Sequence, residues 1–293
     1  MKLLTTDEAA DYLRLKERKL YELVANQAIP CTKITGRWLF PQAELDRWLA
    51  SSVTRPDGMR TAEPMPIVGG SHDPLLEWAL RESGCGLATL AEGSEAGLTR
   101  FAAGEVLAAA IHLHRGQEES DANVEAMRGH ARMHDTVLIN FARREQGLLV
   151  AAGNPRKLAS LDDALRARAR FALRPKGAGA QLLLELLLYR AGTRIEQLST
   201  AKAPCPTGPD IAQAIRAGRA DCGIATRAVA EAAALGFVPL TWEWFDLAVR
   251  QRDYFRAPAQ ALLRFMRTDS FRTRAQELGG YDVGGAAEIR FAP

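Results

Sequence analysis

The sequence predicts an α/β protein in which a small helix-rich module precedes a much larger domain. The first 50 residues hold two short helical patterns, a hairpin and a third helix. Residues 51–66 are polar, include three prolines and lack apolar periodicity, which is typical of a linker. Beyond them, short apolar runs alternate with helical patterns, which favours largely parallel strands connected by helices. We therefore expect a module at residues 1–50, a linker at 51–66 and a large domain at 67–293.

The first two helices of the module are predicted from a capping signal and from apolar spacing. Thr5 followed by Glu8 is a capping box, which satisfies the free amides at the start of a helix. A second helix is expected over residues 17–26. The apolar residues expected to face inward are Ala9, Tyr12 and Leu13 on the first helix and Leu20, Leu23 and Val24 on the second.

A hairpin and a third helix complete the module. Strands are expected at 31–34 and 37–40, because they flank the turn residues Thr35 and Gly36. Pro41 suits the first turn of a third helix, because a helix needs no amide donor there. The expected inward face of that helix carries Leu45, Trp48 and Leu49.

The larger domain shows the alternation of elements that a parallel sheet needs. Helices are expected over residues 73–82 and from Ser94 onward. Apolar runs predict strands at 66–68, 87–90, 106–111, 136–139, 148–151, 170–173, 222–225 and 237–240.

Composition excludes several classes of protein. The 293-residue chain carries a formal net charge of +3, which permits a nucleic-acid partner without requiring one. Its four cysteines are scattered with no CxxC pair, so we expect thiols in a reducing compartment rather than a disulfide or zinc framework. We find no secretory signal pattern and no apolar run of the roughly 18 residues that a membrane helix requires. We therefore expect a cytoplasmic protein.

Because the sequence lacks a nucleophile elbow, a P-loop, a dinucleotide fingerprint and a metalloprotease motif, we do not expect an enzyme.

The second helix and the hairpin tip carry long polar side chains suited to DNA contact. A recognition helix packs one face on the preceding helix and presents polar side chains on the other. The alternative is that these residues are solvated surface, since Lys and Arg are usually exposed. The residues that we expect to contact DNA are Lys16, Arg18, Lys19 and Tyr21 on the helix and Thr35 and Arg37 at the hairpin.

The module resembles a known DNA-binding family. The segments LTTDEAADYL and AIPCTKITGRWLFPQAELDRWL, with a helix between them, are similar to excisionase-like, MerR-related winged helix-turn-helix domains. This resemblance implies double-stranded DNA as the partner. It places Arg37 and Trp38 on the wing, where Trp38 either braces the wing or touches DNA.

Three glycine-rich or small-residue turns precede helices in the larger domain. They are residues 69–73, 92–94 and 176–180. Free amides at a helix N-terminus bind anions, and glycine lets a ligand approach the backbone closely. Because the carboxyl ends of strands converge on one crevice in open α/β sheets, three such turns together indicate an anion site.

The larger domain resembles type II periplasmic-binding proteins, and in particular the cytoplasmic molybdate-binding-protein-like domains attached to DNA-binding modules. The segments that carry this resemblance are GGSHDPLLEWAL, EGSEAGLTRFAAGEV, RPKGAGAQLLLELLL, AIRAGRADCGIATRAVAEAAALGFVPLTWEWFDLAV and LGGYD. The resemblance implies two lobes, the second at about 150–238, joined by crossing strands near 148–154 and 237–247. It implies a ligand between the lobes, and the candidate ligand-binding residues are Ser71, His72, Gly93, Ser94, Arg174, Lys176, Gly177 and Gln181.

The third turn departs from the family pattern. Relatives often read G-S-G-T-R there, whereas this chain has alanine at 178 and 180 and glutamine at 181, so two hydroxyls and a guanidinium are missing. Asp73 and Glu92 also lie close to the other two turns and would repel a dianion unless they point away. The expected effector is therefore either a molybdate- or tungstate-like oxyanion or a larger anion such as a molybdenum-cofactor-like molecule, and no cofactor is required.

Four histidines invite a metal interpretation that the spacing does not favour. His112 and His114 alternate at the end of an expected strand, so they should point to opposite faces. His130 and His134 could share a helical face. We therefore expect no metal site.

These features predict a ligand-responsive transcriptional regulator. The N-terminal module would bind operator DNA, and closure of the two lobes on a small anion would change the spacing of paired modules, so we expect a homodimer or higher homo-oligomer. The alternative is a cofactor-binding carrier or an enzyme of molybdenum metabolism with an N-terminal interaction module.

Overall fold

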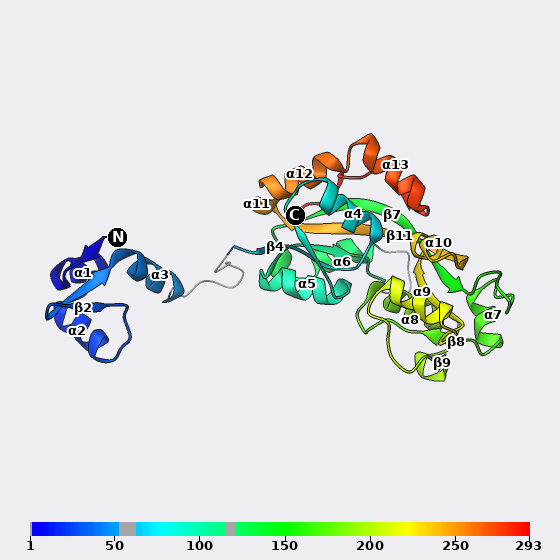
Figure 1. The fold of residues 1–293 in the computed structure, drawn as a ribbon, viewed down its shortest axis with the longest axis horizontal. Coiled ribbons are helices and arrows are strands. Elements are labelled where there is room, and N and C mark those ends of the chain that lie inside the picture. The colour runs from blue at the N-terminus through cyan, green and yellow to red at the C-terminus, as the bar shows by residue number, and fades with distance from the viewer. Residues whose placement is uncertain (1, 53–62, 115–120) are drawn as a thin grey trace. The chain divides into compact units, whose positions relative to one another are not determined.

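The computed structural model describes residues 2–52, 63–114 and 121–293 and has two compact units, Met1–Thr61 and Ala62–Pro293 (Figure 1). We call them the N-terminal unit and the large unit. Of the expected linker, residues 53–62 lie outside the described residues. The linker prediction was too long at both ends, because the third helix continues to Ser52 and a strand begins at Met65.

The N-terminal unit has three helices and a three-stranded antiparallel sheet among its described residues. The capping box of Thr5 and Glu8 is present. The turn of the hairpin takes positive φ at Thr35 (47°) and Gly36 (83°), as a tight two-residue turn requires. The elements are β1 (Leu3–Leu4), α1 (Thr6–Leu13), α2 (Glu17–Ala25), β2 (Thr32–Ile34), β3 (Arg37–Pro41) and α3 (Gln42–Ser52), with strand order β1-β3-β2.

Two side chains that were expected in the core of this unit, Tyr12 and Leu49, are exposed instead. Tyr12 is 42% exposed and Leu49 is 39% exposed, although both were expected to face inward. On α1 the buried positions are Ala9 and Ala10, and Tyr12 instead donates a hydrogen bond from its hydroxyl to Asp46 Oδ1 at 2.5 Å. A phenol suits such a boundary position because its ring is apolar and its hydroxyl is polar.

The large unit is built on one mixed sheet whose described strands follow the order β5-β4-β6-β11-β7-β10-β8-β9, with β12 and β13 also pairing with β7. The strands are β4 (Met65–Gly70), β5 (Ala88–Ala91), β6 (Val106–Ile111), β7 (Thr136–Val150), β8 (Arg170–Ala172), β9 (Ser199–Thr200), β10 (Cys222–Thr226), β11 (Gly236–Arg250), β12 (Tyr281–Asp282) and β13 (Ile289–Phe291). The helices are α4 (Pro74–Glu82), α5 (Ser94–Ala103), α6 (Ala122–Arg128), α7 (Leu161–Arg166), α8 (Gly179–Arg190), α9 (Gly208–Arg216), α10 (Arg227–Ala232), α11 (Gln251–Tyr254), α12 (Ala257–Phe265) and α13 (Asp269–Leu278). Two short 3₁₀ turns cover Ala131–Met133 and Ile195–Gln197.

Two long antiparallel strands, β7 and β11, run through the whole large unit (Figure 1). The sheet is parallel on either side of them, at β5-β4-β6 and at β10-β8-β9. The expected strands at 136–139 and 148–151 are therefore the two ends of β7. The polar residues between them, within 140–147, belong to the same strand, and their side chains are mostly buried and paired with other polar groups.

The two long strands join two lobes with separate apolar cores. Lobe 1, residues 63–114, 121–142 and 244–293, is built around side chains such as Leu75, Phe141 and Phe245. Lobe 2, residues 147–240, is built around side chains such as Phe171 and Leu184. The chain thus crosses between lobes at about 143–146 and 241–243, and the first crossing precedes the segment 148–154 where it was expected.

No helix among the described residues is long and apolar enough to span a membrane.

Candidate ligand cleft and DNA-binding surface

The glycine-rich turns of the two lobes lie against each other. The amide of Glu95, in the first turn of α5, donates a hydrogen bond to the carbonyl of Gly177 at 3.2 Å. A Cβ added at Gly93 would lie only 3.1 Å from the Cα of Ala178. The N-termini of α5 in lobe 1 and α8 in lobe 2 are therefore in contact, and side chains larger than hydrogen have no room there.

The two predicted hydroxyl donors lie at the same junction. Ser71 Oγ is 2.9 Å from Ser94 Oγ, and both residues are buried. Ser94 Oγ also exchanges hydrogen bonds of 3.1 Å with the backbone of His112. The structure thus brings Ser71, Gly93, Ser94 and Gly177 together, as a ligand site between the lobes would require.

A buried ionic cluster lies where β7 and β11 cross between the lobes. Arg144 is 1% exposed and donates to Asp73 Oδ2 at 2.8 Å and to Glu243 Oε1 at 2.7 Å. Asp73 also accepts a hydrogen bond from the Tyr281 hydroxyl at 2.9 Å and caps α4 through the amide of Leu76. We call the following residues the hinge cluster: Asp73, His112, His114, Arg144, Gln146, Glu243 and Tyr281.

Glu243 is the centre of this cluster. Besides Arg144, its carboxylate contacts Gln146 Nε2 at 2.9 Å, His112 Nδ1 at 3.0 Å and His114 Nε2 at 2.7 Å. Burial by itself raises the pKa of Glu243, but interactions with His112 and Arg144 hold that pKa well below its usual value. Burial lowers the pKa of His112 to about 4, although Glu243 opposes the shift. An ionised carboxylate is therefore held in the interior by surrounding donors.

The expectation that His112 and His114 point to opposite faces was wrong. Strand β6 ends at Ile111, so the two histidines lie beyond the regular pleat and its alternation does not apply to them. Both rings contact the same oxygen of Glu243, and their ligand atoms and that oxygen lie within 4.8 Å of one another.

Two buried polar atoms beside the cluster have no hydrogen-bond partner among the described residues. They are Gln146 Oε1 and Thr226 Oγ1, and their residues are 2% and 6% exposed. Gln146 and Thr226 face each other across β7 and β10, so their side chains lie on the same side of the sheet. Because an unsatisfied buried polar atom costs about 1–3 kcal/mol, this position is suited to a polar ligand or water.

The acidic residues beside the turns are paired with arginines. Asp73 is paired with Arg144, and Glu92 forms an ion pair with Arg100 at 2.5 Å. Each carboxylate therefore has a guanidinium partner, although Arg144 is shared between Asp73 and Glu243.

Three more of the predicted ligand residues line a cavity on lobe 2. Arg174, Lys176 and Gln181 line this cavity, which has a volume of about 600 Å³. Arg174 donates to the Pro206 carbonyl at 2.7 Å, and burial lowers its pKa to about 10. His72 lies beside Glu77, at a space of only about 10 Å³, which is barely the size of one water.

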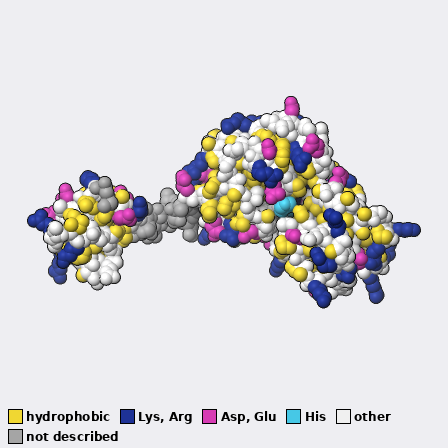
Figure 2. Space-filling model, in the orientation of Figure 1, with side chains coloured by type: hydrophobic (Ala, Val, Ile, Leu, Met, Phe, Trp, Pro, Cys, Tyr) yellow, Lys and Arg dark blue, Asp and Glu magenta, His cyan; other side chains and the backbone are white. Residues whose placement is uncertain are grey.

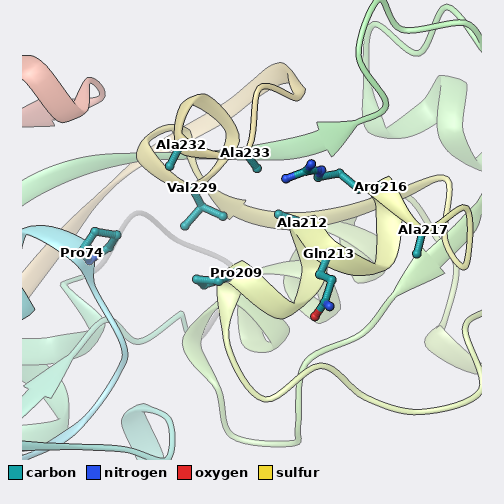
Figure 3. Close-up of a pocket in the computed structure, with 9 residues that line it drawn as sticks. All are labelled: Pro74, Pro209, Ala212, Gln213, Arg216, Ala217, Val229, Ala232 and Ala233. Atoms are coloured by element: carbon teal, nitrogen blue, oxygen red, sulfur yellow. The ribbon is translucent and has the colours of Figure 1, made fainter.

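A larger cavity opens between the start of α4 and lobe 2. Its volume is about 630 Å³, within the range of small-molecule sites. Pro74 faces it from lobe 1, and Pro209 and Val229 face it from α9 and α10, while the Arg216 side chain extends over α9 toward Ala233 (Figure 3). This space is apolar with one cationic group, so it suits an anion with an apolar portion.

The residues expected to contact DNA are all exposed. Lys16 is the N-cap of α2, and Arg18, Lys19 and Tyr21 follow on the helix. Thr35 and Arg37 lie at the hairpin tip, and basic and acidic atoms are interspersed on the N-terminal unit (Figure 2). Lys19 forms an ion pair with Glu22 at 2.6 Å, and Lys33 lies over the Trp38 ring. The ring of Trp38 is half-buried against the core of the unit, so it braces the hairpin.

The hinge cluster was not expected from the sequence. Arg144 and Gln146 lie in a polar run, and Glu243 lies between two tryptophans. The signal that could have identified them is the apolar sequence on both sides of each position, which is unusual for a loop but normal for a strand that crosses between two cores.

Acid is expected to destabilise the large unit between about pH 6.5 and pH 4. The unfolded chain binds a proton at His112 near pH 6.5, whereas the folded chain binds it only near pH 4, so stability is complete above 6.5 and falls by up to about 1.4 kcal/mol per pH unit below it. The depressed pKa of Glu243 acts in the same direction, and Arg144 and His114 are the other charged or titratable neighbours. Calorimetric melting between pH 7 and pH 4.5 would measure this. His112→Gln should flatten the profile and the exposed His130→Gln should not; equal profiles for both would contradict the assignment.

The fold and the cleft define a class of protein: a two-lobed binding domain, preceded by a helix-turn-helix module. The chain belongs to the family described as the PBP superfamily domain, whose model matches residues 77–267. A second model, the helix-turn-helix domain, matches residues 3–52. Both matched domains are of binding kinds rather than enzymes.

Known proteins of similar sequence and structure agree with this assignment. The uncharacterized protein YvgK of Bacillus subtilis (strain 168) is 23% identical over 95% of this chain and 94% of its own length. Similar solved structures include the sulfate-binding protein SubI of Mycobacterium tuberculosis H37Rv (17% identity, TM-score 0.51, 73% of this chain and 84% of that one). The tungstate ABC transporter of Geobacter sulfurreducens is also similar (14% identity, TM-score 0.50, 73% of this chain and 99% of that one). These likenesses establish the fold.

Proposed function

We propose that the protein is a ligand-responsive one-component transcriptional regulator. The N-terminal unit binds operator DNA, and the large unit binds a small anionic effector between its lobes. The observation that carries the proposal is the meeting of Ser71, Ser94 and the N-termini of α5 and α8 at a junction between two lobes. Helix N-termini favour negative charge, and the two strands that cross there allow the lobes to open and close.

The effector class follows from the groups at the junction. Buried hydroxyls and backbone amides favour an oxyanion of the molybdate or tungstate type, and the similar structures include proteins named for sulfate and tungstate. A cavity of about 630 Å³ in the large unit is larger than a bare oxyanion needs, so a molybdenum-cofactor-like anion is the second candidate. The ligand residues that we propose are Ser71, His72, Gly93, Ser94, Arg174, Lys176, Gly177 and Gln181.

Effector binding should stabilise the large unit, and Gly179→Val should abolish that effect. A ligand at about 100 times its dissociation constant adds about 2.7 kcal/mol to stability. A Cβ at Gly179 would lie 2.2 Å from the carbonyl oxygen of His112, so a larger side chain there keeps the lobes apart. Thermal unfolding with molybdate, tungstate, sulfate and pterin-type compounds measures both effects.

Gly192→Val is the matched control for this experiment, because an added Cβ at Gly192, in the turn after α8, meets no atom within 4 Å. It should lose a little stability through its positive φ but keep the response to the effector. No shift of the wild type with any of the compounds would contradict the effector class.

DNA binding should depend on Arg18 and Arg37. Each guanidinium is exposed on the recognition helix or wing, and loss of one phosphate contact reduces the salt slope of binding by about 1. Fluorescence anisotropy with an operator selected from random duplex DNA, over a series of salt concentrations, measures this for Arg18→Ala and Arg37→Ala. Arg47→Ala on α3, exposed and paired with Glu44, is the control. Unchanged affinity and slope in both test variants would exclude these contacts.

The proposal includes assembly and location. One module of about 50 residues makes few DNA contacts, so we propose a homodimer or higher homo-oligomer in the cytoplasm that reads paired half-sites. Binding that is weak and indifferent to DNA sequence, together with transfer of a bound cofactor to another protein, would instead favour the carrier alternative.

A further inference from the structure

We infer that His112, His114 and Glu243 form a binding site for a divalent transition metal ion. His112 Nδ1 and His114 Nε2 both contact Glu243 Oε2, at 3.0 and 2.7 Å, and the two rings lie nearly perpendicular (86°). Two imidazole nitrogens and one carboxylate oxygen are the ligand set that Zn²⁺ takes in many proteins, with metal–ligand distances of about 2.0–2.2 Å. This site goes beyond the proposed function and does not depend on it.

The surroundings of the three residues provide the orientation that metal ligands need. The other oxygen of Glu243, Oε1, accepts hydrogen bonds from Arg144 and Gln146, which turns Oε2 toward the histidines. Such outer contacts fix the ligands of known metal sites. His112 is 5% exposed and Glu243 is also 5% exposed, so bulk water does not compete strongly for the ion.

The charges of the hinge cluster can accommodate a cation. The carboxylates of Asp73 and Glu243 outnumber the single guanidinium of Arg144 with which they pair. With neutral imidazoles, the cluster therefore has a net charge of about −1, and a divalent ion changes it to about +1. A three-residue site leaves a coordination position open to water or an anion, and an anion there would neutralise the remaining charge.

The three ligand atoms must move slightly apart to bind a metal ion, because they now lie at hydrogen-bond distances from one another. Tetrahedral ligands at about 2.1 Å from a metal lie roughly 3.4 Å apart, which is about 0.4 and 0.7 Å more than the present contacts of 3.0 and 2.7 Å. His114 is at the edge of the cluster, with 12% of its side chain exposed, and can move by this amount.

The test is zinc binding by the full-length protein after treatment with a chelator and desalting. Isothermal titration should show about one Zn²⁺ per chain. His114→Ala and Glu243→Gln should each weaken binding at least by the 10–100-fold that loss of an outer contact causes in known sites. The exposed His130→Ala and the partly exposed thiol variant Cys31→Ser should bind as the wild type does.

A second measurement keeps the inference testable if either variant does not fold. X-ray absorption at the zinc edge of the wild-type protein should show two imidazole ligands with nitrogen and oxygen neighbours. Absence of zinc binding at micromolar concentrations, binding retained in both variants, or a sulfur-dominated shell would overturn the site. Because no DNA or anion is present, these results are independent of the regulator proposal.

Discussion

Arg144→Met is expected to reduce the free energy of unfolding of the large unit by about 3–5 kcal/mol. The guanidinium is 1% exposed and pairs with two buried carboxylates, Asp73 and Glu243. Methionine retains much of the volume but leaves both carboxylates without a counter-charge in the interior. Because each buried charge is costly when it lacks a partner, most of the loss comes from the remaining groups and not from the missing contact itself.

Urea unfolding of the full chain followed by near-ultraviolet circular dichroism would measure this loss. Arg143→Met is the matched control, because Arg143 lies next in the same strand but is exposed and stacks on Trp244, so its effect should stay below about 1 kcal/mol. Adding Glu243→Leu to Arg144→Met should recover part of the stability, since it removes one of the two uncompensated charges. Equal effects of the two arginine variants would show that the cluster is not a buried charge network.

Gly97→Ala is expected to reduce stability by about 2–3 kcal/mol. Helix α5 packs so closely on β4 that a Cβ at Gly97 would lie 2.4 Å from the Cα and 2.6 Å from the nitrogen of Gly70. Both atoms are backbone, so the helix and the strand must separate. Alanine is favoured over glycine within a helix by about 1 kcal/mol, and the expected loss is the net result after that gain.

Gly69→Ala provides the control on the strand beneath α5. Its Cβ would lie 3.4 Å from Val106 Cγ2, which is an ordinary van der Waals contact with a side chain. It should change the unfolding midpoint in urea by much less than Gly97→Ala. If Gly97→Ala proves stabilising, as alanine would be in an exposed helix, α5 does not pack against β4 at this distance.

The sequence by itself determined the local structure and the class of protein. The capping box at Thr5 and Glu8, the Thr35-Gly36 turn and the alternation of strands with helices depend on residues close together in the chain, so they could be read directly. The three glycine-rich turns also indicated where helices α4, α5 and α8 begin, because a helix N-terminus needs particular residues within a few positions.

The tertiary structure decided how distant residues combine. Arg144 and Glu243 are separated by 99 positions and His112 and Glu243 by 131, and a polar residue within a strand reveals nothing about a partner so far away. The pleat rule placed His112 and His114 on opposite faces, but the strand ends at Ile111 and the backbone beyond it turns both rings to one carboxylate. Hydrophobic periodicity predicts which way side chains point only where the backbone is regular. His112 and His114 lie where a strand has ended, and Arg144 and Glu243 lie where two strands pass between the cores. Their arrangement therefore follows from packing of the whole domain, and only the structure reveals it.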